Sequence, residues 1–290
     1  MAVGVWIGLV VWFRPAGDYV IGQRVDRQTV LERGPPVRIL CAVTIITNNR
    51  HHRLAINGTY GSRCDLVVYF SSFGGDRQLH VVSVRNAQAG TWPFLVAVIE
   101  HMDSVIRHWP SPVPTFVLLV DDMTYVLADN LRHYLARHPD TAVLGRVSNR
   151  DSLLPALPIL DFNAGLVVSA QLIGRIVPHL HSSPQCKPSQ ARMAHTFAHC
   201  FQAGLDVRAV DGADVEHGGH RFLHKSPRQL FDDDHSQESM IQRLRSWIGG
   251  RDPSKYCSDS AITFGSIPSY DFYFLDYLIY RVRPMGIDFS

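Results

Sequence analysis

The sequence has no marked excess of charge of either sign. It contains 28 Lys and Arg against 26 Asp and Glu, which gives a formal net charge of +2. Proteins that bind nucleic acid usually present a strongly basic surface, so we expect no nucleic-acid partner. Charged residues make up only 19% of the chain and hydrophobic residues 46%, which excludes an intrinsically disordered protein. A chain of 290 residues is long enough to bury one large core.

Long hydrophobic runs are also scarce. The longest one lies at the N-terminus, in residues 2–13, and is ended by Arg14 and Pro15. It is shorter than the roughly 17–25 apolar residues of a membrane-spanning helix, and no basic residues precede it as in a signal peptide. Residues 1–13 are therefore interpreted as a short hydrophobic anchor or its remnant, or else as a buried strand. Residues 14–36 contain several Pro and Gly and are expected to form a stem or linker.

The five cysteines include no C-x-x-C pair, which argues against a structural zinc site. In a secretory compartment, five cysteines would form two disulfides and leave one thiol. Asn57-Gly58-Thr59 is a sequon for N-glycosylation of Asn57, which agrees with that compartment, although such triplets also arise by chance. The cysteines are Cys41, Cys64, Cys186, Cys200 and Cys257.

Apolar runs that favour strands alternate with amphipathic stretches that favour helices. Strands are predicted at 38–46, 65–72, 79–84, 116–120, 142–145 and 261–264, with a strand–loop–strand over 159–168. Helices are predicted at 51–63, 93–108, 126–138, 170–179 and 236–247, and an aromatic-rich amphipathic helix at 270–283. This alternation predicts an α/β domain over residues 37–290, with a Rossmann-like, mostly parallel sheet covered by helices on both faces.

One predicted strand, Phe116–Val120, leads directly into Asp121 and Asp122. Open α/β sheets bind ligands at the carboxyl ends of their strands. Carboxylates there suit Mn²⁺ or Mg²⁺, which can neutralise the diphosphate of a sugar nucleotide. The next residue, Met123, is a soft thioether and a poor ligand for such a cation. Asp121 and Asp122 are therefore candidates for a vestigial nucleotide-sugar site that binds ribose or a weakly held metal. Alternatively, the two aspartates cap the N-terminus of the following helix.

Several short fragments occur in a fixed order along residues 37–288: Thr59–Cys64, Phe70–Ser72, Asp121–Val126, Leu144–Arg146, Ala164–Ser169, Cys257–Asp259 and Tyr277–Gly286. Together they resemble the core 1 β1,3-galactosyltransferase group of glycosyltransferase family 31. That group includes an active transferase and Cosmc, an inactive chaperone of the endoplasmic reticulum. The resemblance implies a GT-A fold in a type II membrane protein of the Golgi or endoplasmic reticulum. Its enzymes transfer galactose from UDP-galactose to GalNAc on Ser or Thr with Mn²⁺, inverting the anomeric centre.

The resemblance also implies a pattern of disulfides. Cys41 is expected to pair with Cys64, and Cys186 with Cys200. The family usually has two adjacent cysteines where this chain has Tyr256-Cys257. Cys257 is therefore expected to be unpaired or to form an intermolecular bond.

The chain departs from the family at three catalytic positions. The third acid of the family's Asp-Asp-Asp motif, a metal ligand, falls at Met123. The Glu-Asp pair that supplies the general base falls at Met193 and Ala194. The histidine that completes the metal shell falls at Gly265. A general base alone typically contributes roughly 10²–10⁴-fold to the rate, so these losses predict a catalytically degenerate protein.

Three groups of residues elsewhere could replace the missing side chains: Asp232-Asp233-Asp234-His235, then His217, His220 and His224, and finally Asp211, Asp214 and Glu216. The first group is a charge run, which is usually a solvated loop. The histidines have helical spacing, but Gly218-Gly219 opposes a helix. The third group holds the best candidates for a displaced carboxylate, with loop solvation as the alternative role.

The leading hypothesis is a Cosmc-like chaperone or partner of an active galactosyltransferase, which needs no cofactor. Its expected partner is the active paralogue or a second copy of the same chain. The expected location is the secretory pathway, with membrane attachment through the N-terminus. The alternative is an active glycoprotein-N-acetylgalactosamine 3-β-galactosyltransferase with an altered Mn²⁺ site, acting on UDP-galactose and GalNAc-glycoproteins. A third possibility is a lectin-like module that binds UDP-sugar or GalNAc-peptide without turnover.

Overall fold

A computed structural model describes residues 37–75, 79–111, 113, 115–148, 158–187, 192–216, 218–231 and 256–282. The expectations for residues 1–13 and 14–36 and for a helix at 236–247 fall outside these ranges. Within them, no helix is both long enough and apolar enough to cross a membrane.

The main sheet of the described part has seven strands in the order β10-β6-β9-β4-β1-β2-β3. Its strands are β1 (Ile39–Ile45), β2 (Leu66–Ser71), β3 (Val81–Ser83), β4 (Phe116–Asp121), β6 (Val143–Gly145), β9 (Leu166–Ser169) and β10 (Ala209–Asp211). β9 runs antiparallel to both of its neighbours, whereas the other neighbouring strands are parallel. The sheet is therefore mixed but mostly parallel, as predicted.

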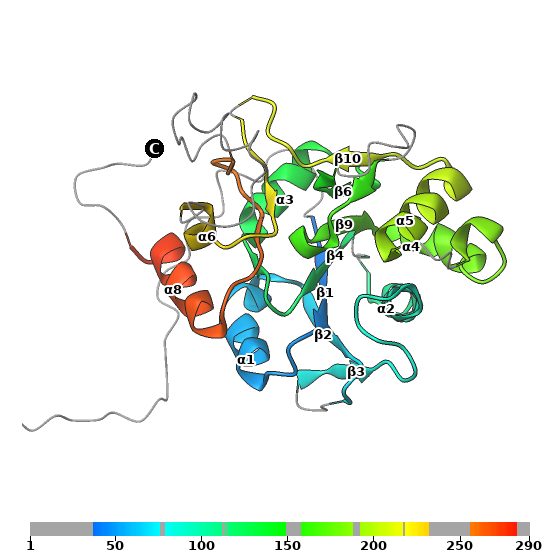
Figure 1. The fold of residues 1–290 in the computed structure, drawn as a ribbon, viewed down its shortest axis with the longest axis horizontal. Helices are drawn as coiled ribbons and strands as arrows, with labels where there is room; N and C mark the ends of the chain where they lie inside the picture. The colour runs from blue at the N-terminus through cyan, green and yellow to red at the C-terminus, as the bar shows by residue number, and fades with distance from the viewer. Residues whose placement is uncertain are drawn as a thin grey trace, which may run out of the picture. The chain divides into compact units, whose positions relative to one another are not determined.

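Helices cover both faces of this sheet (Figure 1). Because successive side chains of a strand point to opposite faces, Leu40 and Ala42 of β1 join one hydrophobic core while Cys41 and Val43 join the other. The first core is completed by α2 (Trp92–Arg107), α4 (Ala170–Ile176) and α5 (Met193–Ala198). The second is completed by α1 (Arg50–Gly58), α3 (Ala128–Arg137) and α8 (Ser269–Tyr280). The predicted α/β class is confirmed.

A second, three-stranded sheet lies beyond the end of β4. The helix predicted from residue 126 begins only at Ala128, because β5 (Tyr125–Val126) pairs antiparallel with β12 (Thr263–Phe264). β12 also pairs with β11 (Phe222–Leu223), a strand that the sequence did not predict. These short ladders bring three distant segments together next to the carboxyl end of β4.

The remaining elements depart from the prediction in small ways. The helix predicted at 51–63 ends at Gly58 and is followed by a 3₁₀ turn over Tyr60–Arg63. The helix predicted at 170–179 ends at Ile176, and a 3₁₀ turn with Pro178 at its start follows, since proline cannot donate the backbone hydrogen bond that would continue the α-helix. A two-stranded sheet, β7 (Val147–Ser148) with β8 (Ile159–Leu160), and a short helix α6 (Pro227–Phe231) complete the described elements.

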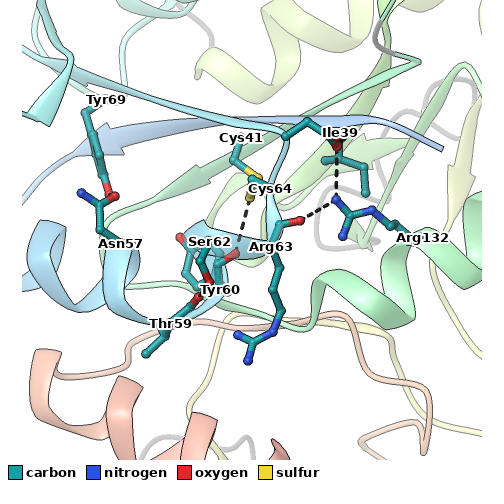
Figure 2. Close-up of a disulfide and its surroundings, with 11 residues drawn as sticks. Ile39, Cys41, Asn57, Thr59, Tyr60, Ser62, Arg63, Cys64, Tyr69 and Arg132 are labelled. Atoms are coloured by element: carbon teal, nitrogen blue, oxygen red, sulfur yellow. Dashed lines mark hydrogen bonds and ion pairs between the residues drawn. A yellow bond between two sulfur atoms is a disulfide. The ribbon is translucent and has the colours of Figure 1, made fainter. Parts of the chain in front are cut away.

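Both disulfides implied by the family resemblance are present. Cys41 in β1 bonds to Cys64, which follows the Tyr60–Arg63 turn (Figure 2). Cys186, at the end of the turn Pro184–Cys186, bonds to Cys200, which lies in the helical turn that follows α5. Cys257 is a free, partly buried thiol.

The turn next to Cys64 also holds two helices in place. Arg132 of α3 donates to the carbonyl of Arg63 (Figure 2). It also donates to the Asp65 carboxylate. The Arg63 guanidinium forms an ion pair with Asp276 of α8 at 2.6 Å and lies 3.8 Å from the centre of the Tyr280 ring. The first strand–helix unit is thereby connected to α3 and α8, which lie far away in the sequence.

Replacing both Cys41 and Cys64 by alanine should lower the free energy of unfolding by about 2–4 kcal/mol, because the unfolded chain regains the freedom that the crosslink removes. Urea unfolding followed by circular dichroism measures this change. The matched control is Cys257→Ala, which removes a thiol that crosslinks nothing in the described chain. Equal stability of the double variant and the control would show that the crosslink does not stabilise the fold.

Candidate functional site

Polar residues gather where the parallel strands of the main sheet end. β1, β4, β6 and β10 all run in one direction, since β9 is antiparallel to both β4 and β6. In the sheet register Thr44 lies opposite Asp121, and Gly145 lies opposite Asp211. This edge is where open α/β sheets bind ligands, and it contains the predicted aspartate pair.

Asp122 holds the end of β1 in place. One of its carboxylate oxygens accepts a hydrogen bond from the Ile46 backbone N–H at 3.0 Å, and the other accepts from Thr47 Oγ1 at 2.5 Å. Its carbonyl accepts from His52 Nδ1 of α1. The residue is completely buried, and both carboxylate oxygens are bonded within the protein. Asp122 is therefore a structural link between β4, β1 and α1.

Asp121 closes the turn that follows β4. Its Oδ1 accepts from the Met123 N–H at 3.0 Å and from Thr124 Oγ1 at 2.7 Å. Tyr125 then enters β5, so the alternative prediction that the aspartates cap a helix is wrong. Burial raises the pKa of Asp121, and its hydrogen bonds to Thr124 and Met123 only partly offset this effect.

The donor set at the end of β4 does not fit Mn²⁺ or Mg²⁺. Asp122 is buried, and its two oxygens are occupied by Ile46 and Thr47. Met123 offers a thioether, and its backbone carbonyl accepts from the Ile267 N–H at 2.8 Å. Across the described ranges, His, Cys, Asp and Glu side chains form no group of three or more that could hold a metal ion. A hard cation needs several oxygen ligands, and only Asp121 remains here to supply one.

The position expected for the general base lies in an apolar helix. Met193 and Ala194 are the first residues of α5. The buried side of this helix belongs to the first hydrophobic core, where Phe197 contacts Phe162 and stacks on Phe201. No residue of α5 is acidic. The position expected for the general base therefore contributes packing and no carboxylate.

Gly265 lies where a side chain does not fit. Its backbone N–H donates to the Leu223 carbonyl at 2.7 Å, which fixes the residue against β11. A Cβ at this position would lie 2.7 Å from the His224 carbonyl oxygen and 3.0 Å from the Asn163 carbonyl oxygen. Both neighbours are backbone atoms, which cannot move aside as a flexible side chain can. A side chain at Gly265, the position expected for the family's metal-binding histidine, would therefore collide with the backbone.

A different polar group lies beside Gly265. His224 Nδ1 lies 3.2 Å from Asp161 Oδ2 and 3.2 Å from Arg146 Nη1. Burial alone would raise the pKa of Asp161, but His224, the Asn163 N–H and Arg146 together hold it below its ordinary value. Arg146 directly follows β6, and Asp161 directly follows β8. No sequence pattern had pointed to Asp161, whereas the position of Arg146 at the end of a predicted strand could have identified it as a candidate.

Two of the three candidate displaced carboxylates, Asp211 and Asp214, form hydrogen bonds that support the fold. Asp214 was expected to be a solvated loop residue or a catalytic acid, but it is buried, forms an ion pair with Arg221 at 2.9 Å and accepts from Ser258 Oγ at 2.5 Å. Asp211 accepts from the backbone N–H groups of Val147 and Ala213. Glu216 is exposed.

The candidate histidines do not form a helical row. His220 forms an isolated bridge with Ala213 and Cys257, whereas His224 follows β11. Burial, with a smaller effect of Arg146, lowers the pKa of His220. His217 and the run Asp232-Asp233-Asp234-His235 lie outside the described residues.

Asn57 is exposed near the end of α1, and its side-chain oxygen accepts from Tyr69 Oη at 2.7 Å (Figure 2). The amide nitrogen, which is the atom that carries a glycan, is not used in that bond. Glycosylation of Asn57 stays a prediction.

Comparison with known proteins supports the resemblance inferred from the motifs. No protein-family model matches the chain. The chain is 22% identical over 271 residues to glycoprotein-N-acetylgalactosamine 3-beta-galactosyltransferase 1 of Xenopus laevis, an alignment that covers 91% of this chain and 72% of the relative. The predicted resemblance to the core 1 galactosyltransferase group is confirmed along most of the chain.

Solved structures with similar folds include two glycosyltransferases. One is involved in glycosylation of the major capsid of PBCV-1, with a TM-score of 0.41 and 8% identity over 83% of this chain and 100% of that one. The other is the galactosyltransferase LgtC in complex with donor and acceptor sugar analogues, with a TM-score of 0.40 and 10% identity over 85% of this chain and 98% of that one.

Proposed function

We propose that this chain is a catalytically degenerate protein of the core 1 galactosyltransferase type, with a GT-A scaffold, that acts as a chaperone or partner of an active galactosyltransferase. The observation that carries the proposal is the state of Asp122. Asp122 lies at the strand end where a carboxylate could bind a metal, next to Met123, but it is a buried side chain whose two oxygens are bonded to Ile46 and Thr47. The apolar α5 and the closed backbone at Gly265 support the same conclusion, because they affect the base and the second metal ligand.

The proposed location is the lumen of the Golgi or endoplasmic reticulum, with residues 1–13 as the membrane anchor of a type II protein. Two disulfides support an oxidising compartment, since such bonds rarely persist in the cytosol.

An active transferase without a metal is the second candidate, and one observation favours it. Arg146 and His224 lie together near the edge that carries Asp121. A guanidinium can bind a diphosphate through two parallel hydrogen bonds and so take over part of the metal's role. Binding there would compete with Asp161, which lies 3.2 Å from His224.

Co-expression with an active core 1 galactosyltransferase tests the proposed partner role. We expect the transferase to be recovered in a higher soluble, active amount with this chain than with an unrelated secreted protein, and to co-purify with it. Unchanged recovery together with no co-purification would contradict the partner role.

Calorimetry tests the site separately. With UDP we expect no heat of binding that depends on Mn²⁺, because the donor set does not fit the ion. Binding of UDP without Mn²⁺ that is lost in Arg146→Ala would favour the second candidate.

A further inference from the structure

Arg53 in α1 is a buried cation without a counter-charge in the described part of the chain. Its exposed fraction is 9%, and its Nε atom is buried without a hydrogen-bond partner. None of the ion pairs within the described ranges involves its side chain, whereas Arg63, Arg132 and Arg221 each pair with an aspartate. Arg53 is therefore more deeply buried than these three arginines and yet lacks the kind of partner that each of them has.

This arrangement is costly unless an anion is bound. Moving a charge out of water without pairing it is strongly unfavourable, and arginine cannot avoid the cost by losing its proton. A buried polar group that lacks a partner within the protein is commonly explained by a bound ion or water molecule. A water molecule would accept the Nε hydrogen but would leave the charge uncompensated, whereas an anion satisfies both requirements.

The sequence around Arg53 supplies no negative charge. Residues 46–64 contain three arginines and two histidines but no acidic residue. Four of these basic residues form the first turn of α1, Arg50–Arg53, where the helix dipole is positive and normally attracts negative side chains. Asp122, whose carbonyl accepts from His52 of α1, directs its carboxylate to Ile46 and Thr47 instead.

Tyr69 of β2 lies beside Arg53 but is neutral. Its hydroxyl donates to Asn57 Oδ1 at 2.7 Å and lies 3.2 Å from the Arg53 carbonyl oxygen, and Figure 2 shows the ring pointing toward Asn57. Burial raises the pKa of Tyr69, and the charge of Arg53 only partly offsets this effect. The phenol therefore keeps its proton at neutral pH and provides no negative charge.

The small exposed area of Arg53 limits the size of the ligand. An opening to 9% of the residue admits an ion or the anionic end of a small molecule rather than the flat surface of another protein. The guanidinium fork matches a carboxylate or a phosphate group, which it can bind through two parallel hydrogen bonds. The position also differs from that of Arg146 and His224, which follow β6 and β11.

We propose that Arg53 anchors a binding site for a small oxyanion, a phosphate or a carboxylate group, beside α1 and β2. The anion accepts hydrogen bonds from the guanidinium and supplies the counter-charge that the described part of the chain lacks. The positive end of the α1 dipole and the basic first turn add to the attraction. Binding therefore stabilises the folded chain, because the unfolded chain has no such arrangement of charges.

Thermal melting of the full chain with increasing sodium phosphate, at an ionic strength held constant with sodium chloride, tests the proposal. We expect the melting temperature to rise by about 3–6 °C at saturating phosphate, since a ligand that binds only the folded state stabilises it. Arg53→Met should abolish this rise. Without phosphate, this variant should melt at the wild-type temperature or higher, because an apolar side chain replaces an unpaired buried charge.

Two further variants complete the test. Arg175→Met is the matched control, because it removes the same charge from an exposed arginine of α4 and should leave the response to phosphate unchanged. Arg53→Lys keeps the buried charge and so remains informative if the methionine variant does not fold. Because lysine lacks the planar fork, we expect half-maximal stabilisation to need about tenfold more phosphate.

Sodium acetate in place of phosphate distinguishes the two kinds of ligand. A comparable rise in melting temperature would assign carboxylates to the site as well, and no rise would restrict it to phosphate groups. A wild-type chain that melts at the same temperature in phosphate, acetate and chloride would overturn the proposal. An undiminished response to phosphate in Arg53→Met or Arg53→Lys would overturn it too. Because no nucleotide, metal or transferase is present, the result is independent of the proposed function.

Discussion

Asp122→Ala should cost about 3–5 kcal/mol of unfolding free energy and lower the melting temperature by roughly 10 °C. The substitution removes the acceptor for the Ile46 N–H and for the Thr47 hydroxyl. Because Asp122 is completely buried, both donors lose this partner. Each hydrogen bond to a charged group contributes about 1.5–3 kcal/mol. Circular dichroism during heating measures the change. A carboxylate kept for binding a metal would behave differently, because its removal would relieve repulsion and leave stability unchanged or higher.

The neighbouring Asp121 provides the matched control. Asp121→Asn keeps an oxygen that can accept from Met123 and Thr124. Because burial raises the pKa of Asp121 in the folded state above its unfolded value, the folded state binds this proton more tightly. The contribution of Asp121 to stability therefore increases as the pH falls from its pKa in the folded state to its pKa in the unfolded state. Asp121→Asn should be neutral or slightly stabilising at neutral pH, and any gain should disappear in acid. Equal losses in Asp121→Asn and Asp122→Ala would contradict the structural role assigned to Asp122.

Gly265→His should restore no metal affinity and should lower the unfolding free energy by about 1–3 kcal/mol or more, the usual cost of overpacking. The new Cβ would collide with the carbonyl oxygens of His224 and Asn163. Adding Met123→Asp would complete the family's pattern of metal ligands in the sequence. The carbonyl groups of His224 and Asn163 would still obstruct the side chain at position 265. Calorimetry with Mn²⁺ and chemical unfolding measure the two effects.

The control for this experiment is Ser266→His, one residue further along the chain. Ser266 is exposed, so an imidazole there meets no comparable obstacle. Tight Mn²⁺ binding by Met123→Asp/Gly265→His, with normal stability, would show that the site had lost only side chains and had kept its shape.

Local pattern was enough to predict the α/β architecture. The run Phe116–Val120 is apolar on both faces because both faces of β4 are covered by helices, and its aspartates lie at the carboxyl edge as the pattern indicated. The disulfides followed from the family resemblance. The strands and helices, in contrast, could be predicted from periodicity, because periodicity shows which residues of one element are buried.

The roles of the site residues depend on partners that are far away in the sequence. Asp122 is bonded to Thr47, 75 residues earlier, and Asp214 to Ser258, 44 residues later. Neither contact can be recognised from the neighbouring sequence. For this reason loop solvation was an expected role for Asp214, which lies in a polar segment. The short strands β5 and β11 also escaped prediction, because two-residue ladders form only when the rest of the sheet brings their segments together. The exposure of the aromatic residues Tyr270, Phe274 and Tyr277 on α8 was not predicted, because helical spacing shows that one side of a helix is apolar but not which way that side faces.

The most direct test of the central claim is galactose transfer from UDP-galactose to a GalNAc-peptide by the purified chain, measured with and without Mn²⁺. We expect product at the background level under both conditions, since Met123 replaces the acid expected to bind the metal, Asp122 is bonded within the scaffold, and the position expected for the base lies in a helix without an acidic residue. Metal-dependent turnover above background, retained in a preparation free of other galactosyltransferases, would contradict it.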